Sequence, residues 1–415
     1  MTSNRSGKIA FACGTLALLL LPGAAGASGY AVVYSFAGGS DGAGPTTPLS
    51  KDKLGNLYGT AGGGGTGCGG YGCGTVFKLA PDGTETVLYA FNGNDGYLPN
   101  GGLVRDKAGN LYGTTEGGGI YDYGTVFVVA PDGTEKVLYS FCAKSNCSDG
   151  AIPYAGLIDE SAHDFYGTTT SGGDTSCTGG CGTVFEVRLD GKEKVLHAFH
   201  GGSDGYDPQA ALYADSAGNL YGTTGGGGST SCSGYGCGTV FKIAPDGSYA
   251  IVYVFKAGNE DGWGPLASLV ADSVGNLYST TIYGGAYNVG TVFRIAPDGA
   301  EGLLYSFKGR KNNDGAFPRG RLRLDASGNL YGTTSRGGGG DRGLGGGTVF
   351  QLAPNGTETV LYAFCGGPGC REGKEPSGDL TWNGSDKTAL YGTADGGAHG
   401  KGVVFSYTLA PGKKN

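Results

Sequence analysis

Short apolar segments separated by turn-forming residues recur along the whole of this 415-residue chain. β-Branched and aromatic residues dominate these segments, which predicts β-strands. Between them stand sequences such as Asp-Lys-Ala-Gly-Asn and Pro-Asp-Gly, which are typical of tight hairpin turns. No segment has a helical period, so the pattern predicts an all-β chain of antiparallel hairpins. One representative stretch gives four strands, at 101–106, 110–115, 124–130 and 135–141.

The strand pattern belongs to a repeat. The motif Leu-Tyr-Gly-Thr occurs seven times at intervals of 53 to 60 residues, with Phe165 and Ser279 as single departures. The motifs Gly-Thr-Val-Phe and Val-Leu-Tyr-Ser-Phe follow it in register. A four-stranded unit with a period near this size is typical of a propeller blade. The motif tyrosines are Tyr58, Tyr112, Tyr166, Tyr221, Tyr278, Tyr331 and Tyr391.

The chain begins and ends out of phase with this unit. It starts on a strand of the fourth type, at 31–36, and ends just after one of the third type, at 402–407. The N-terminal strand can therefore complete the last sheet and leave no unpaired edge. A linear solenoid would not need this offset and would need polar caps. We predict one domain, 28–408, folded as a seven-bladed β-propeller of four-stranded blades closed by the N-terminal strand.

Composition narrows the class of protein. The 89 glycines and 16 prolines would suggest low complexity, but 39% hydrophobic and 11% aromatic residues can fill a core, which excludes disorder. Glycine does not recur at every third position, which excludes collagen. The net charge of −7 argues against a nucleic-acid partner.

Residues 1–27 have the features of a secretory signal peptide. Arg5 and Lys8 precede an apolar run, and small residues follow it up to Ala27. An uncleaved anchor is the alternative, although the run is shorter than a membrane span needs. Loss of the two basic residues would leave 27 basic and 36 acidic residues, a charge of −9. We expect a secreted bacterial protein, extracellular or at the cell surface, with no membrane span after cleavage.

Ten cysteines remain after this segment, and they form five local pairs. An even number of closely spaced cysteines after a signal peptide predicts loop-closing disulfides in an oxidising compartment. The alternative of a metal site lacks Cys-x-x-Cys spacing and histidine-rich surroundings, so no metal is expected there. The pairs are Cys68/Cys73, Cys142/Cys147, Cys177/Cys181, Cys232/Cys237 and Cys365/Cys370.

The repeated phrases Asn-Leu-Tyr-Gly-Thr-Thr, Gly-Thr-Val-Phe and Ala-Pro-Asp-Gly-Thr-Glu resemble the GloVer-type tandem repeat of bacterial secreted proteins, also called choice-of-anchor repeat proteins. The resemblance covers residues 30–408 and implies no particular activity. Relatives of this kind often end in an anchoring segment. Here 409–415 is a short polar tail, which favours free secretion.

In a propeller blade, the loop between the second and third strands (the inner loop) and the link to the next blade lie on one face of the disc. We call this the loop face, and the side that carries the hairpin turns the hairpin face. All five cysteine pairs fall on the loop face. Variable loops on a rigid scaffold are where binding usually occurs. Protection of glycine-rich loops from proteolysis is the alternative role of the disulfides.

An acidic residue before glycine recurs in all seven links. A ring of these carboxylates could hold Ca²⁺ or a sugar, but Asp-Gly is also ordinary turn chemistry. The four histidines do not converge in the repeat, which gives no support to a metal or acid–base cluster. No other cofactor is expected. The possible ring comprises Asp41, Asp95, Asp149, Asp204, Asp261, Asp314 and Glu372.

Blade six concentrates positive charge, with eight basic residues against three aspartates between 308 and 342. Arg321 and Arg323 alternate along the predicted innermost strand, where blade two has Gly102 and Val104. Two side chains pointing together toward the channel would form an anion site, because arginine offers planar donors to a carboxylate. A solvated basic patch is the alternative. The candidate ligand residues are Arg310, Asp314, Arg319, Arg321 and Arg323.

These features favour a monomeric, non-enzymatic module that binds an extracellular glycan or protein through its loop face. A polysaccharide hydrolase or lyase with its acid and base on different links, and a structural envelope component, are the alternatives. A catalytic propeller should break its repeat at positions that converge on the channel mouth. The departures are scattered along the chain, which favours binding.

Overall fold

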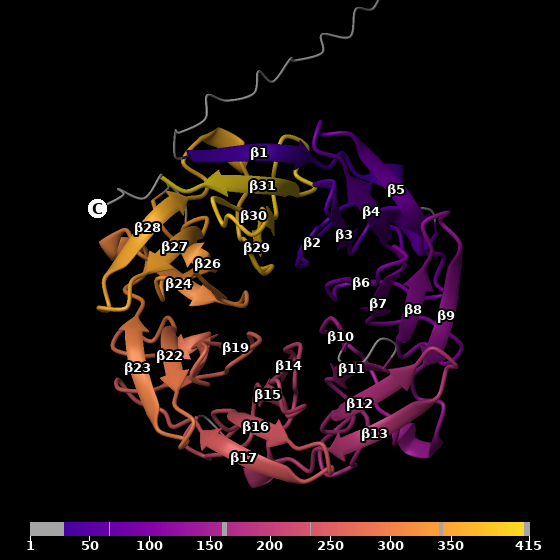
Figure 1. Ribbon diagram of the computed structural model, residues 1–415, viewed down its shortest axis with the longest axis horizontal. Helices are drawn as coiled ribbons and strands as arrows, with labels where there is room; N and C mark the ends of the chain where they lie inside the picture. The colour runs from indigo at the N-terminus through magenta and orange to yellow at the C-terminus, as the bar shows by residue number, and fades with distance from the viewer. Residues whose placement is uncertain (1–28, 66, 160–163, 233, 340–342, 411–415) are drawn as a thin grey trace, which may run out of the picture.

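Seven small sheets stand around a central axis in the computed structural model (Figure 1). The structure describes residues 29–65, 67–159, 164–232, 234–339 and 343–410, so the expected signal peptide and the end of the polar tail lie outside the described residues. The prediction of an all-β, seven-bladed propeller is confirmed. Within the described residues the only helices are short 3₁₀ turns: η1 (Gly39–Asp41), η2 (Gly69–Tyr71), η3 (Ser145–Cys147), η4 (Gly202–Asp204), η5 (Arg310–Asn312) and η6 (Pro368–Cys370).

Each blade is an antiparallel meander whose first strand is nearest the axis. Blade one contains β2 (Ser50–Lys51), β3 (Leu57–Ala61), β4 (Thr75–Leu79) and β5 (Glu85–Ala90); blade two β6 (Val104–Arg105), β7 (Leu111–Thr115), β8 (Thr125–Val129) and β9 (Glu135–Ser140). Blade three contains β10 (Ile158–Asp159), β11 (Asp164–Thr169), β12 (Thr183–Arg188) and β13 (Glu193–Ala198); blade four β14 (Tyr213–Ala214), β15 (Leu220–Thr224), β16 (Thr239–Ile243) and β17 (Tyr249–Val254).

The later blades add small extra pairings. Blade five contains β19 (Val270–Ala271), β20 (Leu277–Thr281), β22 (Thr291–Ile295) and β23 (Glu301–Ser306), with the side pair β18 (Gly262–Trp263) and β21 (Tyr283–Gly284). Blade six contains β25 (Arg323–Leu324), β26 (Leu330–Gly337), β27 (Thr348–Leu352) and β28 (Glu358–Ala363), with β24 (Gly315–Pro318) also paired to β26. Blade seven contains β29 (Thr381–Trp382), β30 (Ala389–Ala394) and β31 (Val403–Thr408).

The N-terminal strand closes the ring. β1 (Gly29–Ser35) pairs antiparallel with β31 and supplies the fourth strand of blade seven, as Figure 1 shows for the indigo and yellow strands. The closure is also hydrogen-bonded near the axis, where Thr393 donates to the Thr47 carbonyl at 3.2 Å. The same threonine position joins neighbouring blades elsewhere, for example from Thr114 to Ala155 at 2.8 Å. The predicted closure is therefore confirmed.

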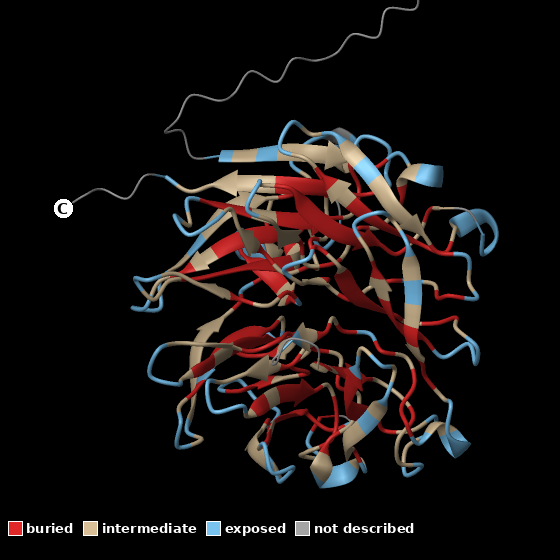
Figure 2. Cartoon of the chain, turned by 45° about the vertical axis from the view of Figure 1, so that its right-hand side comes forward, coloured by how far each residue is buried: buried red, intermediate tan, exposed pale blue. Residues whose placement is uncertain are grey.

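Seven pairs of phenylalanines fill the interfaces between blades. In each pair, a phenylalanine that follows an outer strand meets the Gly-Thr-Val-Phe phenylalanine of the next blade, edge to face at 4.9–5.2 Å. Phe36 and Phe77 form one such pair, and both are fully buried. The middle strands of each blade are buried, whereas the outermost strands are only partly buried and many loops at the perimeter are exposed (Figure 2). These repeated rings explain why both phenylalanine positions recur in every unit.

The first hairpin turn of most blades is built on one aspartate. Asp52 accepts hydrogen bonds from the Asn56 backbone and side chain at 2.9 and 2.8 Å, and from the Tyr58 hydroxyl at 3.1 Å. The phrase Asp-x-x-Gly-Asn-Leu-Tyr is therefore a single hydrogen-bonded unit. These bonds outweigh burial and lower the pKa of Asp52.

All five predicted disulfides are present, and their cysteines lie four or five positions apart in inner loops and links. The strand order places these loops on the loop face, as expected. Several local disulfides fit an extracellular protein. In the part of the chain that is described, no helix is long and apolar enough to cross a membrane. The disulfides are Cys68–Cys73, Cys142–Cys147, Cys177–Cys181, Cys232–Cys237 and Cys365–Cys370.

Three of the disulfides reach into the core. Cys73, Cys181 and Cys237, the second cysteines of the inner-loop pairs, have no exposed surface. Each directly precedes a Gly-Thr-Val-Phe strand, and Cys181 packs in an apolar cluster with Val184 and Phe199. The predicted pairing of these cysteines is confirmed. Their sulfur atoms are buried and fasten each inner loop to the core of its blade.

Candidate functional site

A cavity of about 980 Å³ lies on the axis at the loop face, where the seven links meet. Links and the first residues of inner loops form its wall. Every link has the form Asp/Glu-Gly-x-x-Pro-x-x-x-Leu, which turns the chain from the perimeter to the innermost strand. The first and third residues after the proline line the cavity in all seven blades.

These lining positions are where the repeat varies. The first position carries seven different residue types, although the proline before it and the leucine after it never change. The expectation that departures are scattered is therefore wrong in three dimensions, because many of them converge on the channel mouth. In order, the first position holds Thr46, Asn100, Tyr154, Gln209, Leu266, Arg319 and Ser377, and the third holds Pro48, Gly102, Gly156, Ala211, Ser268, Arg321 and Asp379.

The residue before each link proline fixes the direction of the wall. All seven have left-handed backbones, with φ between 52° and 68°, and five are not glycine, although such residues seldom adopt this conformation. Each amide also donates to an inner-loop carbonyl of the preceding blade, as Leu98 does to Cys73 at 3.0 Å and Asp207 to Cys181 at 3.1 Å. The links are thereby tied to the blade behind them. The seven are Gly44, Leu98, Ile152, Asp207, Gly264, Phe317 and Glu375.

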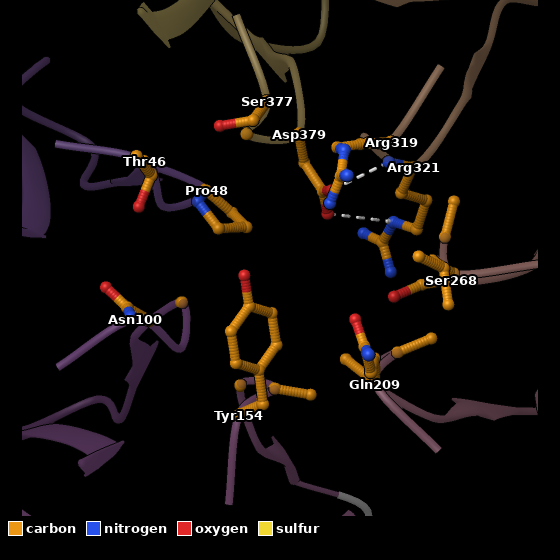
Figure 3. A pocket seen from close by; sticks show the side chains of 18 of the residues that line it. Thr46, Pro48, Asn100, Tyr154, Gln209, Ser268, Arg319, Arg321, Ser377 and Asp379 are labelled. Atoms are coloured by element: carbon orange, nitrogen blue, oxygen red, sulfur yellow. Dashed lines mark hydrogen bonds and ion pairs between the residues drawn. The ribbon is translucent and has the colours of Figure 1, made fainter. Parts of the chain in front are cut away.

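Blades six and seven form a charged wall, seen in Figure 3 with Arg319, Arg321 and Asp379. The Arg321 amide donates to Asp379 at 2.7 Å, and its Nε lies 3.7 Å from the same carboxylate. Arg323 also lines the cavity but donates its Nε to the Leu380 carbonyl. Burial, and then the charge of Arg321, lower the pKa of Arg323 to about 10.

Arg319 is the arginine of this wall whose guanidinium is available to a ligand. None of the hydrogen bonds and ion pairs found among the described residues involves its side chain. It lies within electrostatic range of Tyr154 on the opposite wall, whose pKa is raised mainly by burial while Arg319 opposes that shift. Tyr154 is 40% exposed and projects into the cavity (Figure 3).

A second charged group lies beside this wall and also lines the cavity. Arg336 pairs with Glu375 through Nη1 and Oε1, and Asp395 is near enough to feel the charge of Glu375. Burial, and then Glu375, raise the pKa of Asp395, while Lys374 and Arg336 oppose the change. Two carboxyl groups, Glu375 and Asp395, therefore share this part of the cavity.

The other walls are neutral. Thr46, Asn100, Gln209 and Ser268 supply hydroxyl and amide groups around the opening in Figure 3. Asn100 donates to the Glu116 carboxylate, and Gln209 donates to Asp207 at 2.8 Å, which orients both amides. The cavity therefore combines cationic, acidic and neutral hydrogen-bonding groups on different sides.

The seven link acids do not line this cavity. Asp149 has no exposed surface and accepts hydrogen bonds from the Tyr139 hydroxyl at 2.6 Å and the Ala143 amide at 2.8 Å. The other acids are tied to backbone amides of their links in the same way, under the outer strands: Asp41, Asp95, Asp204, Asp261, Asp314 and Glu372.

The arginines suggested by the sequence separate into two groups. Arg319, Arg321 and Arg323 come together in the cavity, whereas Arg310 donates to the Gly343 carbonyl at 2.9 Å on the rim. Asp314 accepts from Tyr305 at 2.8 Å, away from them. Of the basic cluster, Arg342 lies outside the described residues.

The three described histidines, His197, His200 and His399, do not line the cavity. His197 takes the place of the outer-strand tyrosine and contacts Asp204 at 3.1 Å, while His200 contacts Asp174 at 3.1 Å. His163 lies outside the described residues. Across the described ranges there is no group of three or more His, Cys, Asp or Glu side chains placed to hold a metal ion.

Sequence reasoning missed most of the cavity. Asp379, Glu375 and Asp395 were not singled out, and neither were the neutral residues from Thr46 to Gln209. The signal was present in the aligned links, where one column varies completely between an invariant proline and an invariant leucine. Comparing the repeats column by column would have found it.

Fold and cavity define a seven-bladed repeat propeller with a polar axial pocket. The model of the Gloeobacter/Verrucomicrobia repeat matches residues 20–177, 66–256 and 229–415, and the chain belongs to this family. The resemblance to the GloVer-type repeat is thereby confirmed. No curated protein is similar enough in sequence to match.

Two solved structures of low identity, each with a TM-score of 0.50, share the fold. A candidate 6-phosphogluconolactonase of Bacteroides uniformis is 17% identical, with a TM-score of 0.50 over 80% of this chain and 87% of that one. The extracellular domain of a candidate one-component system of B. thetaiotaomicron is 14% identical, with a TM-score of 0.50 over 89% of this chain and 41% of that one. A gluconolactonase of Xanthomonas campestris is 13% identical, with a TM-score of 0.42 over 92% and 90%.

Proposed function

We propose that this chain is a secreted propeller that binds an extracellular glycan, and that the axial cavity holds an acidic sugar of that glycan. One observation carries the proposal: the cavity is lined by the first residue after each link proline, a position at which the otherwise regular repeat differs in every blade. Packing alone would favour the same residue in each blade. Seven different residues around one opening suit a ligand without sevenfold symmetry.

The chemistry of the wall supports a sugar acid. Arg319 offers planar donors suited to a carboxylate. Thr46, Asn100 and Gln209 can exchange hydrogen bonds with hydroxyl groups, and Tyr154 offers a ring face and a hydroxyl. A cavity of about 980 Å³ is of the size that small-molecule sites have.

The test is binding of digalacturonate by calorimetry. Arg319→Ala should weaken binding by about tenfold or more, since a charged hydrogen bond contributes about 1.5–3 kcal/mol. Lys107→Ala, an exposed cation on the hairpin face, is the matched control and should bind normally. Arg321 and Arg323 are poorer probes because both hold neighbouring groups. Equal affinity of the Arg319 variant and the control would refute the assignment.

Catalysis on the same glycan is the second candidate function, and two observations favour it: the acid pair, and the convergence of the variable link positions on the channel mouth. Asp395, whose pKa is raised by burial, could donate a proton to a leaving oxygen, with Glu375 and Arg336 paired beside it. An active enzyme should release reducing ends or unsaturated products from polygalacturonate. Asp395→Asn should then lower kcat at least 100-fold with little change in binding. If the wild-type chain binds the polymer without turnover, the pair serves binding only.

A further inference from the structure

Large hydrophobic side chains are exposed mainly on one face of the molecule. Among the described residues, eleven are exposed, and nine of these lie in inner loops or links of the loop face. Leu54 and Val274, in hairpin turns, are the other two. Single exposed apolar residues need no explanation, but a concentration on one face indicates a contact surface.

Five of the nine occupy one position of the repeat, three residues before the glycine of the Gly-Thr-Val-Phe motif. We call these five residues the aromatic crown. Blades three and seven have Gly179 and His399 at this position. The crown and its exposed fractions are Tyr71 at 91%, Tyr121 at 45%, Tyr235 at 76%, Tyr287 at 53% and Leu344 at 63%.

The crown is held on a firm backbone. Tyr71 and Tyr235 lie inside the loops closed by Cys68–Cys73 and Cys232–Cys237. Their carbonyls accept hydrogen bonds from Gly64 at 2.8 Å and Gly227 at 3.0 Å. The Leu344 carbonyl accepts from Gly337 at 2.8 Å in the same way. A fixed backbone lowers the entropic cost of binding through the exposed rings.

The setting of each ring points to sugars. Tyr71 and Tyr235 have glycine on both sides, so no apolar side chain adjoins either ring along the chain, whereas Tyr121 has the exposed Ile120 beside it. A protein interface needs a packed apolar centre, whereas a polysaccharide presents separate ring faces along its length. Next to the crown residues in sequence only Asp122 is charged, which does not suit an anionic membrane or nucleic acid.

The crown meets the cavity at Leu344, the one crown residue that also lines the cavity wall. We infer that the aromatic crown is an extended glycan platform, on which a polysaccharide chain stacks while one of its acidic sugars occupies the cavity. This inference rests on the proposed function and names its ligand as a polymer. The platform adds affinity through several weak contacts on one chain.

Chain length provides the test. Binding of digalacturonate and of polygalacturonate is measured for the wild type and for a Tyr71→Ala, Tyr235→Ala, Tyr287→Ala triple variant. The wild type should bind the polymer at least tenfold more tightly per chain, and the triple variant should lose that gain while keeping its affinity for the dimer. Leu54→Ala with Val274→Ala, similarly exposed on the hairpin face, should change neither.

The outcomes separate the two proposals. Unchanged polymer binding by the triple variant would overturn the platform and leave the cavity assignment intact. Loss of dimer binding in Arg319→Ala with retained, crown-dependent polymer binding would support the platform. Absence of binding to both probes by the wild type would overturn both. Restoration of the length effect by phenylalanine at the three positions would show that stacking, and not the tyrosine hydroxyl, is responsible.

Discussion

Thr75 has a buried hydroxyl without a partner, although its counterparts in five other blades are paired. In those blades the last threonine of the second strand meets the first threonine of the third at 2.7–2.9 Å, as Thr115 meets Thr125. Blade one has Ala61 opposite Thr75 in the same register. Blade one thus has alanine where these five blades have threonine, and this difference leaves the buried Thr75 hydroxyl without a hydrogen-bond partner.

Ala61→Thr should therefore stabilise the protein. The restored hydrogen bond is expected to add about 0.5–1.5 kcal/mol to the free energy of unfolding. Urea denaturation at one pH measures it. Ala61→Val is the control, since it adds similar volume without the hydroxyl and should not stabilise. Equal effects of both variants would mean that cavity filling, and not the hydrogen bond, is responsible.

At the scale of elements, the sequence predicted the order and number of strands but not their lengths near the axis. The expected strand 101–106 shortens to β6 (Val104–Arg105). Pro99 has no amide donor, and the Leu98 and Asn100 amides bond to Cys73 and Leu98 instead of to a strand. Gly102 and Leu103 line the cavity instead, and Asp106 belongs to the hairpin turn. The alternation of apolar and polar residues along a short segment does not show which groups its backbone amides form hydrogen bonds with.

The bulge in the outer hairpin was also missed. Between the third and fourth strands the register shifts at the Val-Phe of the Gly-Thr-Val-Phe motif, for example at Val76/Phe77. Leu88 is the extra residue there. The bulge lets Tyr89 reach Asp95 at 2.5 Å while Phe91 remains in the core. Arg321 and Arg323 could be placed at the channel from alternation alone, but Asp379 on the next blade could not, because its partner is 58 residues away.

At the scale of the whole molecule, buried acids recur between blades. The first residue of the outer strand is a glutamate in five blades, and each has a buried Oε1 without a hydrogen bond. Each of these glutamates lies beside a link acid, and the outer-strand tyrosine of the preceding blade contacts that acid. Glu85, for example, lies beside Asp41, which accepts a hydrogen bond from the Tyr34 hydroxyl. The five are Glu85, Glu135, Glu193, Glu301 and Glu358.

These glutamates should make the ring less stable as pH rises. Burial, and then the neighbouring aspartate, raise the pKa of Glu85, Glu135, Glu301 and Glu358 from 4.5 to about 7. Between these two values the folded chain retains protons that the unfolded chain releases, so the free energy of unfolding falls as pH rises through this window. The loss is present in full above pH 7. Below pH 4.5 these glutamates are protonated in both the folded and the unfolded chain, so they no longer change the free energy of unfolding with pH.

The measurement is the melting temperature between pH 4.5 and 8. The wild type should melt at a higher temperature at pH 5 than at pH 7.5. A variant with glutamine at Glu85, Glu135, Glu301 and Glu358 should show a much flatter profile, because the amide is neutral throughout. Lys78→Gln, on a third strand of the same sheet as Glu85, is a control that removes charge without touching the acid pairs. A wild-type melting temperature that rises from pH 5 to 7.5 would contradict the assignment. A quadruple variant with the wild-type slope would show that other groups titrate in this window.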